Sequence, residues 1–256
     1  MTFTPLVGPL SAGLKLDESD IHIWYAQLDL APECVVALTS RLPEDEQNRA
    51  HRFSFDRDRV RFVVCRQLLR VLLGRYLGVP AAELRFRFSG KGKPYLPGQE
   101  LHFNLAHSGG AALIALARLQ PLGIDLEQIR LIPDADSLVE RFFSQAERLA
   151  FQSLPETLKM KAFFTCWTRK EAFLKATGEG LSFPLSDFTV TFLPDEPVRI
   201  SNVRSAADFA SSWSLYHLEP EEGFVGALAI PGNQWHLTAR TLSVEQWAGE
   251  LLPGSR

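Results

Sequence analysis

Two kinds of hydrophobic pattern run along the chain. Apolar residues recur near helical spacing over 57–77, and a second long helical stretch covers 158–176. Gly78 and Gly178 follow these stretches, and glycine commonly ends a helix there. The pattern therefore predicts two long helices, and the arginines of the first are expected on the side opposite its core-facing residues. A shorter helix is expected to begin at 42–46, where proline and acidic residues suit a helix start.

Apolar and alternating stretches around these helices predict strands. They lie at 21–26, 84–88, 101–105, 111–117, 123–127, 188–192, 213–218, 224–230 and 235–241. We expect an α+β fold of two pseudo-symmetric lobes, 1–120 and 121–256, although no close residue-by-residue repeat relates them. In each lobe a long helix packs on a small antiparallel sheet, and the active site lies between the lobes. Residues 1–20 are expected to form a loose lead-in, and 244–251 a final helix.

Three acidic residues and one lysine stand out against this framework. In the strand predicted at 123–127, Asp125 and Glu127 share one face because side chains alternate. In the second helix, Glu171 and Lys175 lie four residues apart on one face. Three carboxylates at 4 Å would repel by about 1 kcal/mol per pair in water. Magnesium, which takes few protein oxygens and often phosphate oxygens, would relieve this repulsion. The alternative is a solvent-facing edge strand and an ordinary helix ion pair.

Composition and charge narrow the function classes. Hydrophobic residues make up 46% of the 256 residues, enough for a large core in one domain or two. With 27 basic and 30 acidic residues, the net charge of −3 gives no sign of binding to nucleic acid or an anionic membrane. The apolar run 111–117 is too short to cross a bilayer, and no signal peptide is recognised, so a cytoplasmic location is expected. The cysteines, Cys34, Cys65 and Cys166, are expected to be reduced and structural.

Four motifs in order resemble a known family. They are His107-Ser108-Gly109, the 123–127 run Gly-Ile-Asp-Leu-Glu, Phe142-Phe143-Ser144 followed by Glu147, and the 167–175 run Trp-Thr-Arg-Lys-Glu-Ala-Phe-Leu-Lys. This series is similar to that of the Sfp-type 4'-phosphopantetheinyl transferases, over about residues 42–190. The resemblance implies a two-lobed fold with pseudo-symmetry. It also implies transfer of the phosphopantetheine arm of coenzyme A to a serine of an acyl or peptidyl carrier protein, with release of adenosine 3',5'-bisphosphate.

The resemblance also implies roles for the acids and the lysine. Asp125, Glu127 and Glu171 would hold Mg²⁺, with pyrophosphate oxygen and water as further ligands. Lys175 would lie against the same phosphates. Glu147 has two explanations: it completes a capping box with Ser144, or it assists the attacking serine. The general base is therefore left between Glu147 and Glu171.

Basic residues are implied at the nucleotide end. His107, in a glycine-rich turn, would meet the 3'-phosphate, and Lys93, in a Gly-Lys-Pro segment, would contact coenzyme A. Arg49 and Arg52 fall where the family places cations for the 3'-phosphate, or they are simply a solvated helix face. The run 181–185 is the implied contact for a helix of the carrier protein.

Two rivals belong to other classes. A magnesium nuclease is disfavoured because Gln128 and Ile129 follow Glu127, where a strand lysine two residues after an acid is usual. A non-catalytic carrier-binding scaffold is disfavoured because none of the candidate metal ligands is missing. The expected protein is a monomeric enzyme, and the sequence does not identify its carrier protein or pathway.

Overall fold

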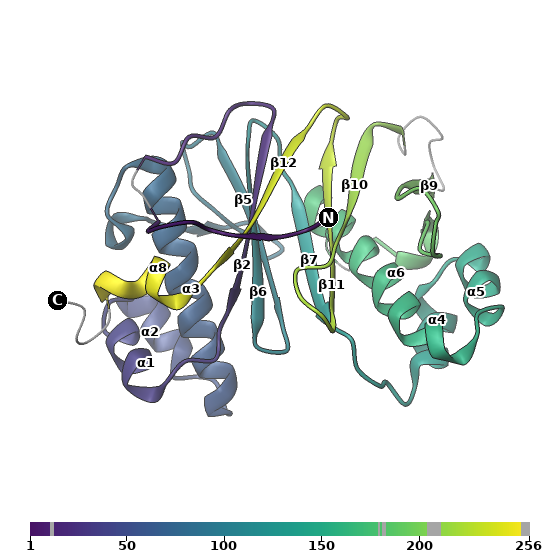
Figure 1. Ribbon diagram of the computed structural model, residues 1–256, viewed down its shortest axis with the longest axis horizontal. Helices are drawn as coiled ribbons and strands as arrows, with labels where there is room; N and C mark the ends of the chain where they lie inside the picture. Colours follow the sequence, from purple (N-terminus) through teal and green to yellow (C-terminus); the bar gives the residue numbers. More distant parts are fainter. Residues whose placement is uncertain (11–12, 179, 181–182, 204–210, 252–256) are drawn as a thin grey trace.

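Two β-sheets form the centre of the protein. The structure, a computed structural model, describes residues 1–10, 13–178, 180, 183–203 and 211–251. Within them the five-stranded sheet has the order β1-β12-β2-β6-β5, and the three-stranded sheet has the order β10-β11-β7 (Figure 1). The fold is therefore mixed α+β, as predicted.

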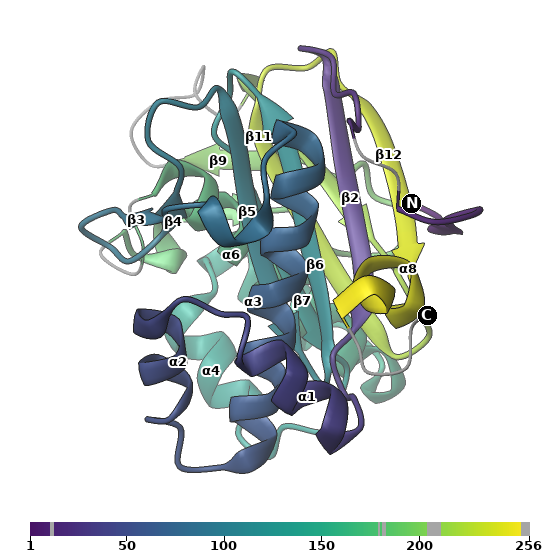
Figure 2. The same ribbon diagram turned by 90° about the vertical axis from the view of Figure 1, so that its left-hand side faces the viewer.

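The five-stranded sheet carries the first long helix. Its strands are β1 (Thr4–Pro5), β12 (His236–Leu242), β2 (Asp20–Gln27), β6 (Ala111–Arg118) and β5 (Leu101–Ser108). The helices on its outer side are α1 (Pro32–Thr39), α2 (Glu44–Ala50), α3 (Asp56–Leu77), the 3-10 turn η1 (Ala81–Glu83) and α8 (Val244–Ala248), which continues into η4 (Gly249–Leu251). Figure 2 shows α3 lying along the sheet, with α1, α2 and α8 around it.

The three-stranded sheet carries the second long helix. It consists of β10 (Trp213–Leu218), β11 (Phe224–Pro231) and β7 (Gly123–Gln128), all antiparallel. Helix α6 (Glu156–Thr177) covers it, with α4 (Ala135–Phe142), α5 (Gln145–Gln152) and the turn η3 (Leu185–Asp187) nearby. Two small ribbons complete the fold: β3 (Arg87–Phe88) with β4 (Pro94–Tyr95), and β8 (Phe188–Val190) with β9 (Ile200–Val203).

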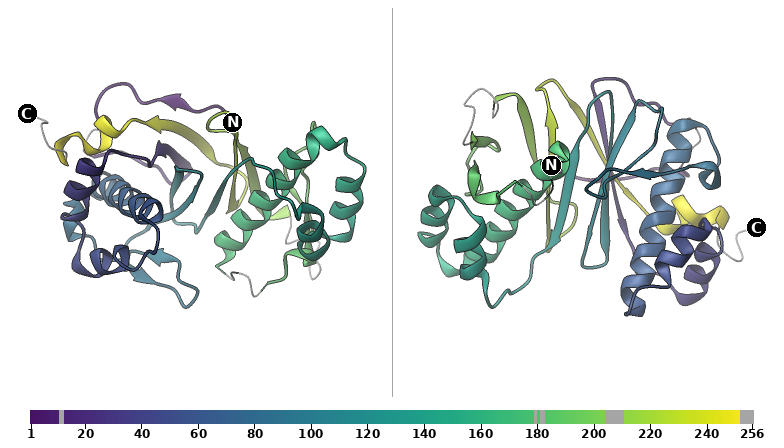
Figure 3. Two further views of the ribbon diagram at one scale, coloured as in Figure 1. Left: turned by 90° about the horizontal axis from the view of Figure 1, so that it is seen from below. Right: turned by 180° about the vertical axis from the view of Figure 1, so that it is seen from behind.

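The sheets pack face to face, with helices on both outer sides (Figure 3). Alternation along β2 shows how this arises: Ile21, Ile23 and Tyr25 enter the core between the sheets, while Trp24 and Ala26 face α3. We call the core between α3 and the five-stranded sheet the first core, and the core between α6 and the three-stranded sheet the second core. Each strand in the middle therefore has two buried faces, which explains continuous apolar runs such as that of β6.

Both long helices match their predicted ranges, and each ends at a glycine in the left-handed region: Gly78 has φ 68° and Gly178 has φ 75°. The strand predicted at 84–88 is shorter, because only Arg87 and Phe88 have partners, on β4. The predicted lead-in contains one short strand, β1, paired with β12.

The C-terminal segment corrects one expectation. Strand β12 lies between β1 and β2 and runs parallel to both, so the first sheet is not purely antiparallel. Helix α8 then packs on α3, with Trp247 buried in the first core. A division at residue 120 therefore leaves β12 and α8 outside the half on which they pack. The strand pattern predicted β12 itself but held no information about its long-range partner.

Candidate active site

Strand β7 turns two carboxylates away from the core between the sheets. Ile124 and Leu126 are buried in that core, and Asp125 and Glu127 alternate with them. The predicted alternation is confirmed. A Cβ added to Gly123 would lie 2.0 Å from the Ala172 carbonyl oxygen, so α6 packs directly on the backbone of β7. This close approach brings the last turns of α6 next to the acids.

Lys175 and Asp125 form an ion pair across this contact. The distance from Lys175 Nζ to Asp125 Oδ1 is 2.6 Å, so Lys175 does not merely pair with Glu171 along the helix. Oδ2 of Asp125 is buried and has no hydrogen-bond partner among the described residues. Leaving a buried acceptor unsatisfied costs about 1–3 kcal/mol, so this oxygen is suited to a bound cation.

Glu127 is held by the first half of the molecule. Ser108, at the end of β5, donates from Oγ to Glu127 Oε2 at 2.7 Å and accepts the backbone N–H of Gln128 at 3.2 Å. One hydroxyl therefore fixes both the carboxylate and the strand that carries it. The His-Ser-Gly motif contained this residue, but its contact across the sheets is not visible in the sequence.

Burial raises the pKa of all three carboxyl groups, those of Asp125, Glu127 and Glu171. The Asp125 and Glu127 charges raise the pKa of Glu171 further, so the acids lie close enough to repel one another. In the described part of the chain, however, no three His, Cys, Asp or Glu side chains are grouped closely enough to hold a metal ion. The predicted direct convergence of three protein ligands is therefore not seen. Oxygen-only donors with one unpartnered oxygen still fit Mg²⁺, which keeps water and phosphate ligands.

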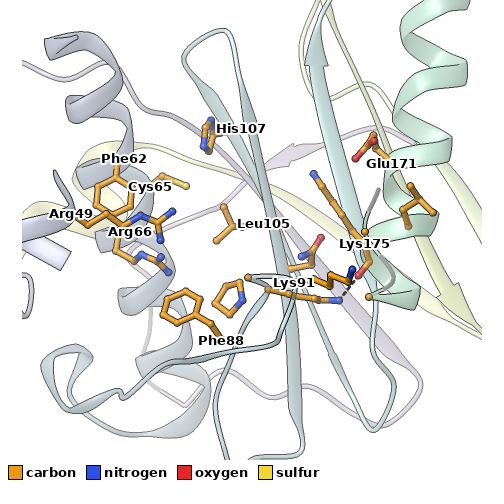
Figure 4. A pocket seen from close by; sticks show the side chains of 17 residues that line it. Arg49, Phe62, Cys65, Arg66, Phe88, Lys91, Leu105, His107, Glu171 and Lys175 are labelled. Atoms are coloured by element: carbon orange, nitrogen blue, oxygen red, sulfur yellow. Dashed lines mark hydrogen bonds between the residues drawn. The ribbon is translucent and has the colours of Figure 1, made fainter. Parts of the chain in front are cut away.

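A cavity of about 330 Å³ opens beside Glu171 and is rich in cations. Figure 4 shows Arg49 and Arg66 on one side of it, Glu171 and Lys175 on the other, and Leu105 and His107 between them. Among the described residues that line the cavity, the only acid is Glu171, and the basic residues are Arg49, Arg66, Lys91, Lys93, His107 and Lys175. Such a cavity suits a ligand with several negative charges.

The two arginines predicted for the nucleotide end separate in the structure. Arg49 lines the cavity, with its guanidinium carbon 5.3 Å from the centre of the Phe62 ring. Arg52 follows the end of α2 and lines a different hollow with Asp45. The structure therefore brings only Arg49 to the cavity with the other candidates.

Arg66 also lines the cavity and was not singled out in the sequence. It is 7% exposed, contrary to the expectation for the arginines of this helix, and lies between the Phe62 and Phe86 rings. Its Nε lies 3.4 Å from Glu46 Oε1, while Nη1 is buried with no partner among the described residues. The compensating acid comes from α2, so the burial of Arg66 could not be read from its own helix.

His107 and Lys93 line the cavity as well. Burial lowers the pKa of His107, and the positive charges of Lys175 and Arg61 lower it further. Burial, together with the charge of Lys175, lowers the pKa of Lys93 to about 8. The Lys93 ammonium group already donates to two backbone carbonyls, so its hydrogen bonds are not those expected of a phosphate ligand.

Glu147 does not line the cavity. It is 1% exposed, forms the predicted capping box with Ser144, accepts the Val190 N–H at 2.8 Å and pairs with Lys170 at 2.8 Å. Between the two explanations left open, the structure supports the capping box, because every contact of this carboxylate belongs to the second core. Of the run 181–185, residues 181–182 lie outside the described residues, and Leu185 is buried in the second core.

A cavity lined by basic side chains and Glu171, next to the acids of β7, suits a phosphate-bearing compound. Family models agree: the model described as 4'-phosphopantetheinyl transferase superfamily matches residues 121–231, and the model described as 4'-phosphopantetheinyl transferase, N-terminal, matches residues 31–118. The chain is 38% identical to the 4'-phosphopantetheinyl transferase HetI of Nostoc sp. over 89% of its own length and 94% of that protein. The chain belongs to the 4'-phosphopantetheinyl transferase superfamily.

Two further similarities differ in strength. The chain is 30% identical to the 4'-phosphopantetheinyl transferase Sfp of Bacillus subtilis, over 69% of this chain and 78% of that one. A crystal structure of a holo-(acyl-carrier-protein) synthase from Bacillus anthracis in complex with CoA (3',5'-ADP) covers 44% of this chain and 96% of that chain, with 20% identity and a TM-score of 0.36. Among the described residues, no helix has the length and apolar character needed to span a membrane.

Proposed function

We infer that the protein transfers the 4'-phosphopantetheine arm of coenzyme A to a serine of an apo carrier protein and releases adenosine 3',5'-bisphosphate. The observation that carries this conclusion is the position of the acids. In a chain of this family, the acid strand β7 lies against the end of α6. Glu171 and Lys175 line the cationic cavity, and Lys175 is paired with Asp125.

The proposed roles follow from what each side chain contacts. Asp125, Glu127 and Glu171 would hold Mg²⁺, which supplies positive charge for the pyrophosphate when bound. Ser108 keeps Glu127 oriented through its 2.7 Å hydrogen bond. Lys175 offers an ammonium group to the phosphates, and its pair with Asp125 keeps that group beside the acids. Arg49, Arg66 and Lys91 supply further positive charge along the cavity, and His107 offers an imidazole N–H to the 3'-phosphate.

We propose Glu171 as the general base. It lines the cavity, where its carboxylate can accept a proton directly or through a water molecule. The serine oxygen of the carrier protein bonds to the phosphorus of the phosphopantetheine arm, the bond from that phosphorus to the nucleotide breaks, and the hydroxyl proton passes to Glu171. Glu147 has no part in this step, because its carboxylate is used within the second core.

The organisation of the molecule extends the proposal. We propose that the halves divided near residue 120 are related by pseudo-symmetry, in support of which each has one 22-residue helix on the outer side of a sheet. The protein is proposed to act as a cytoplasmic monomer, since residues of a single chain line the whole cavity. Light scattering coupled to gel filtration would measure the mass of the active species.

The test is to incubate the protein with coenzyme A, Mg²⁺ and an apo carrier protein and to weigh the carrier. We expect a gain of one phosphopantetheine group that is abolished by EDTA and by Asp125→Ala. A panel of acyl and peptidyl carriers identifies the preferred substrate. If the protein binds a carrier but no carrier in the panel gains mass, the proposal is overturned in favour of a non-catalytic scaffold.

A further inference from the structure

The Lys93 side chain, on the β3–β4 hairpin of the first half of the molecule, forms hydrogen bonds with the second half. The Nζ atom of Lys93 donates to the Leu122 carbonyl oxygen at 2.8 Å and to the Lys175 carbonyl oxygen at 2.6 Å. Leu122 immediately precedes the acid strand β7, and Lys175 lies in the last turn of α6. One ammonium group thus contacts the backbone of both elements that carry the proposed catalytic residues.

Both carbonyls need a donor from elsewhere. The last four carbonyls of an α-helix lack partners within the helix, and Lys175 is among those residues in α6. A cation at this end of a helix is also favoured by the helix dipole. Lys93 therefore acts as a C-terminal cap for α6, supplied by a distant part of the chain.

The Leu122 carbonyl lies at the start of the open edge of β7. Within the described strands, β7 is the last of its sheet and pairs only with β11. Side chains of the first half supply hydrogen bonds along its other edge: Asn104 Oδ1 accepts the Ile124 N–H at 2.8 Å, and Ser108 Oγ accepts the Gln128 N–H at 3.2 Å. Lys93 adds the contact at the beginning of the strand, next to the close packing of Gly123 on α6.

We propose that Lys93 is a positioning residue that fastens the β3–β4 hairpin to β7 and α6, rather than a ligand of a coenzyme A phosphate. The hairpin brings Phe88, Lys91 and Pro94 to the cavity, so this contact fixes their place relative to Asp125 and Lys175. The link to catalysis rests on the proposed function, whereas the contact between the halves does not.

The experiment compares Lys93→Met with Lys91→Met by amide hydrogen–deuterium exchange, in protein without coenzyme A. Lys91 is the matched control, because it lies on the same hairpin and lines the same cavity with an exposed side chain. Loss of two charge-assisted hydrogen bonds in Lys93→Met should speed exchange about tenfold or more at residues 87–95 and 122–128. It should also lower the melting temperature by about 3–8 °C. Lys91→Met should leave both unchanged.

Kinetics and a conservative variant complete the test. In Lys93→Met, kcat should fall about tenfold while the KM for coenzyme A changes by less than about threefold, because positioning and not ground-state binding is lost. Lys93→Arg, which can still donate to both carbonyls, should restore slow exchange. If Lys93→Met does not fold, Lys93→Gln replaces it, with an intermediate exchange rate expected.

The proposal is overturned if Lys93→Met exchanges and melts like the wild type, whether or not its KM for coenzyme A rises. A raised KM with unchanged exchange would identify a phosphate ligand. The exchange measurement uses neither coenzyme A nor a carrier protein. A protein without transferase activity but with the expected exchange would therefore contradict only the proposed function.

Discussion

Two of the acid–lysine ion pairs of helix α6 involve a buried acid, and they differ in how many of their polar atoms have hydrogen-bond partners. In the pair of Glu147 and Lys170, the side chains are 1% and 0% exposed. Glu147 also accepts two backbone N–H groups, and Lys170 donates to the carbonyls of Leu185 and Phe188. Every partner of this pair lies within the second core, so the pair holds α5, α6 and β8 together.

The pair of Asp125 and Lys175 is only partly satisfied. Its distance of 2.6 Å is as short, but Oδ2 of Asp125 has no partner within the described residues, and the Lys175 side chain is 31% exposed. Lys175 also lines the cavity, whereas neither Glu147 nor Lys170 does. The difference between the two pairs shows that a buried ion pair is not by itself a sign of catalysis. What marks the site is a short pair with unused hydrogen-bonding capacity beside a cavity.

The largest expected effect on stability comes from removing the lysine of the Glu147–Lys170 pair. Lys170→Met leaves the Glu147 carboxylate buried without its cation, which should lower the free energy of unfolding by about 3–5 kcal/mol. Denaturant unfolding measures this change. The control is Lys159→Met, which removes a surface pair with the exposed Glu156 and should cost less than about 1 kcal/mol. Equal small losses in both variants would mean that the buried pair does not hold the second core.

Gly123→Ala tests whether the Asp125–Lys175 pair depends on the close packing of α6 on β7. A Cβ at this position meets the backbone of α6, which no side-chain rotation can relieve. We expect a loss of about 2–4 kcal/mol in unfolding free energy, with a loss of transfer activity in the folded fraction. Gly90→Ala is the control, since its added Cβ meets nothing within 4 Å. Wild-type stability and activity in Gly123→Ala would show that the close packing is not required.

Metal addition and removal should distinguish the two pairs. At ten times its dissociation constant, Mg²⁺ should stabilise the folded protein by about 1.4 kcal/mol, and EDTA should reverse this. Asp125→Asn should abolish the shift in thermal unfolding. The surface variant Glu219→Gln should retain it, because Glu219 pairs with Lys161 away from the site. If Mg²⁺ still stabilised Asp125→Asn, the Asp125 carboxylate would not be a ligand of the metal.

The smallest expected effect is the pH dependence of that shift. Folding raises the pKa of Asp125, Glu127 and Glu171, so without metal their contribution to stability is present at low pH and is lost as the pH rises through the raised values. Mg²⁺ competes with these protons, so its stabilising shift should shrink as the pH falls, beginning above the ordinary glutamate value of 4.5. Thermal unfolding at several pH values, with and without Mg²⁺, measures this. A shift independent of pH would contradict it.

Local patterns were enough to predict much of the framework. The ranges of α3 and α6, the alternation in β7 and the capping box at Ser144 follow from neighbouring residues in the sequence. The motif series likewise indicated Asp125 and Glu171 as residues of one site, because the resemblance to a family links motifs on different elements.

Long-range contacts could not be predicted in this way. The parallel place of β12 depends on β1 and β2 at the other end of the chain. The partners of Lys93 are backbone carbonyls, which no side-chain pattern reveals. Arg66 is buried because Glu46 and two aromatic rings surround it, and Arg52 misses the cavity because α2 ends before it.

The most direct test of the distinction between the two pairs is the transfer rate per folded molecule of Glu147→Gln and Asp125→Asn. Both rates are measured with coenzyme A, Mg²⁺ and one apo carrier protein. The temperature is one at which circular dichroism shows each variant to be folded. Glu147→Gln should keep a rate within about threefold of the wild type, and Asp125→Asn should lose at least about a thousandfold. A comparable collapse in folded Glu147→Gln, or a near-normal rate in Asp125→Asn, would contradict the account.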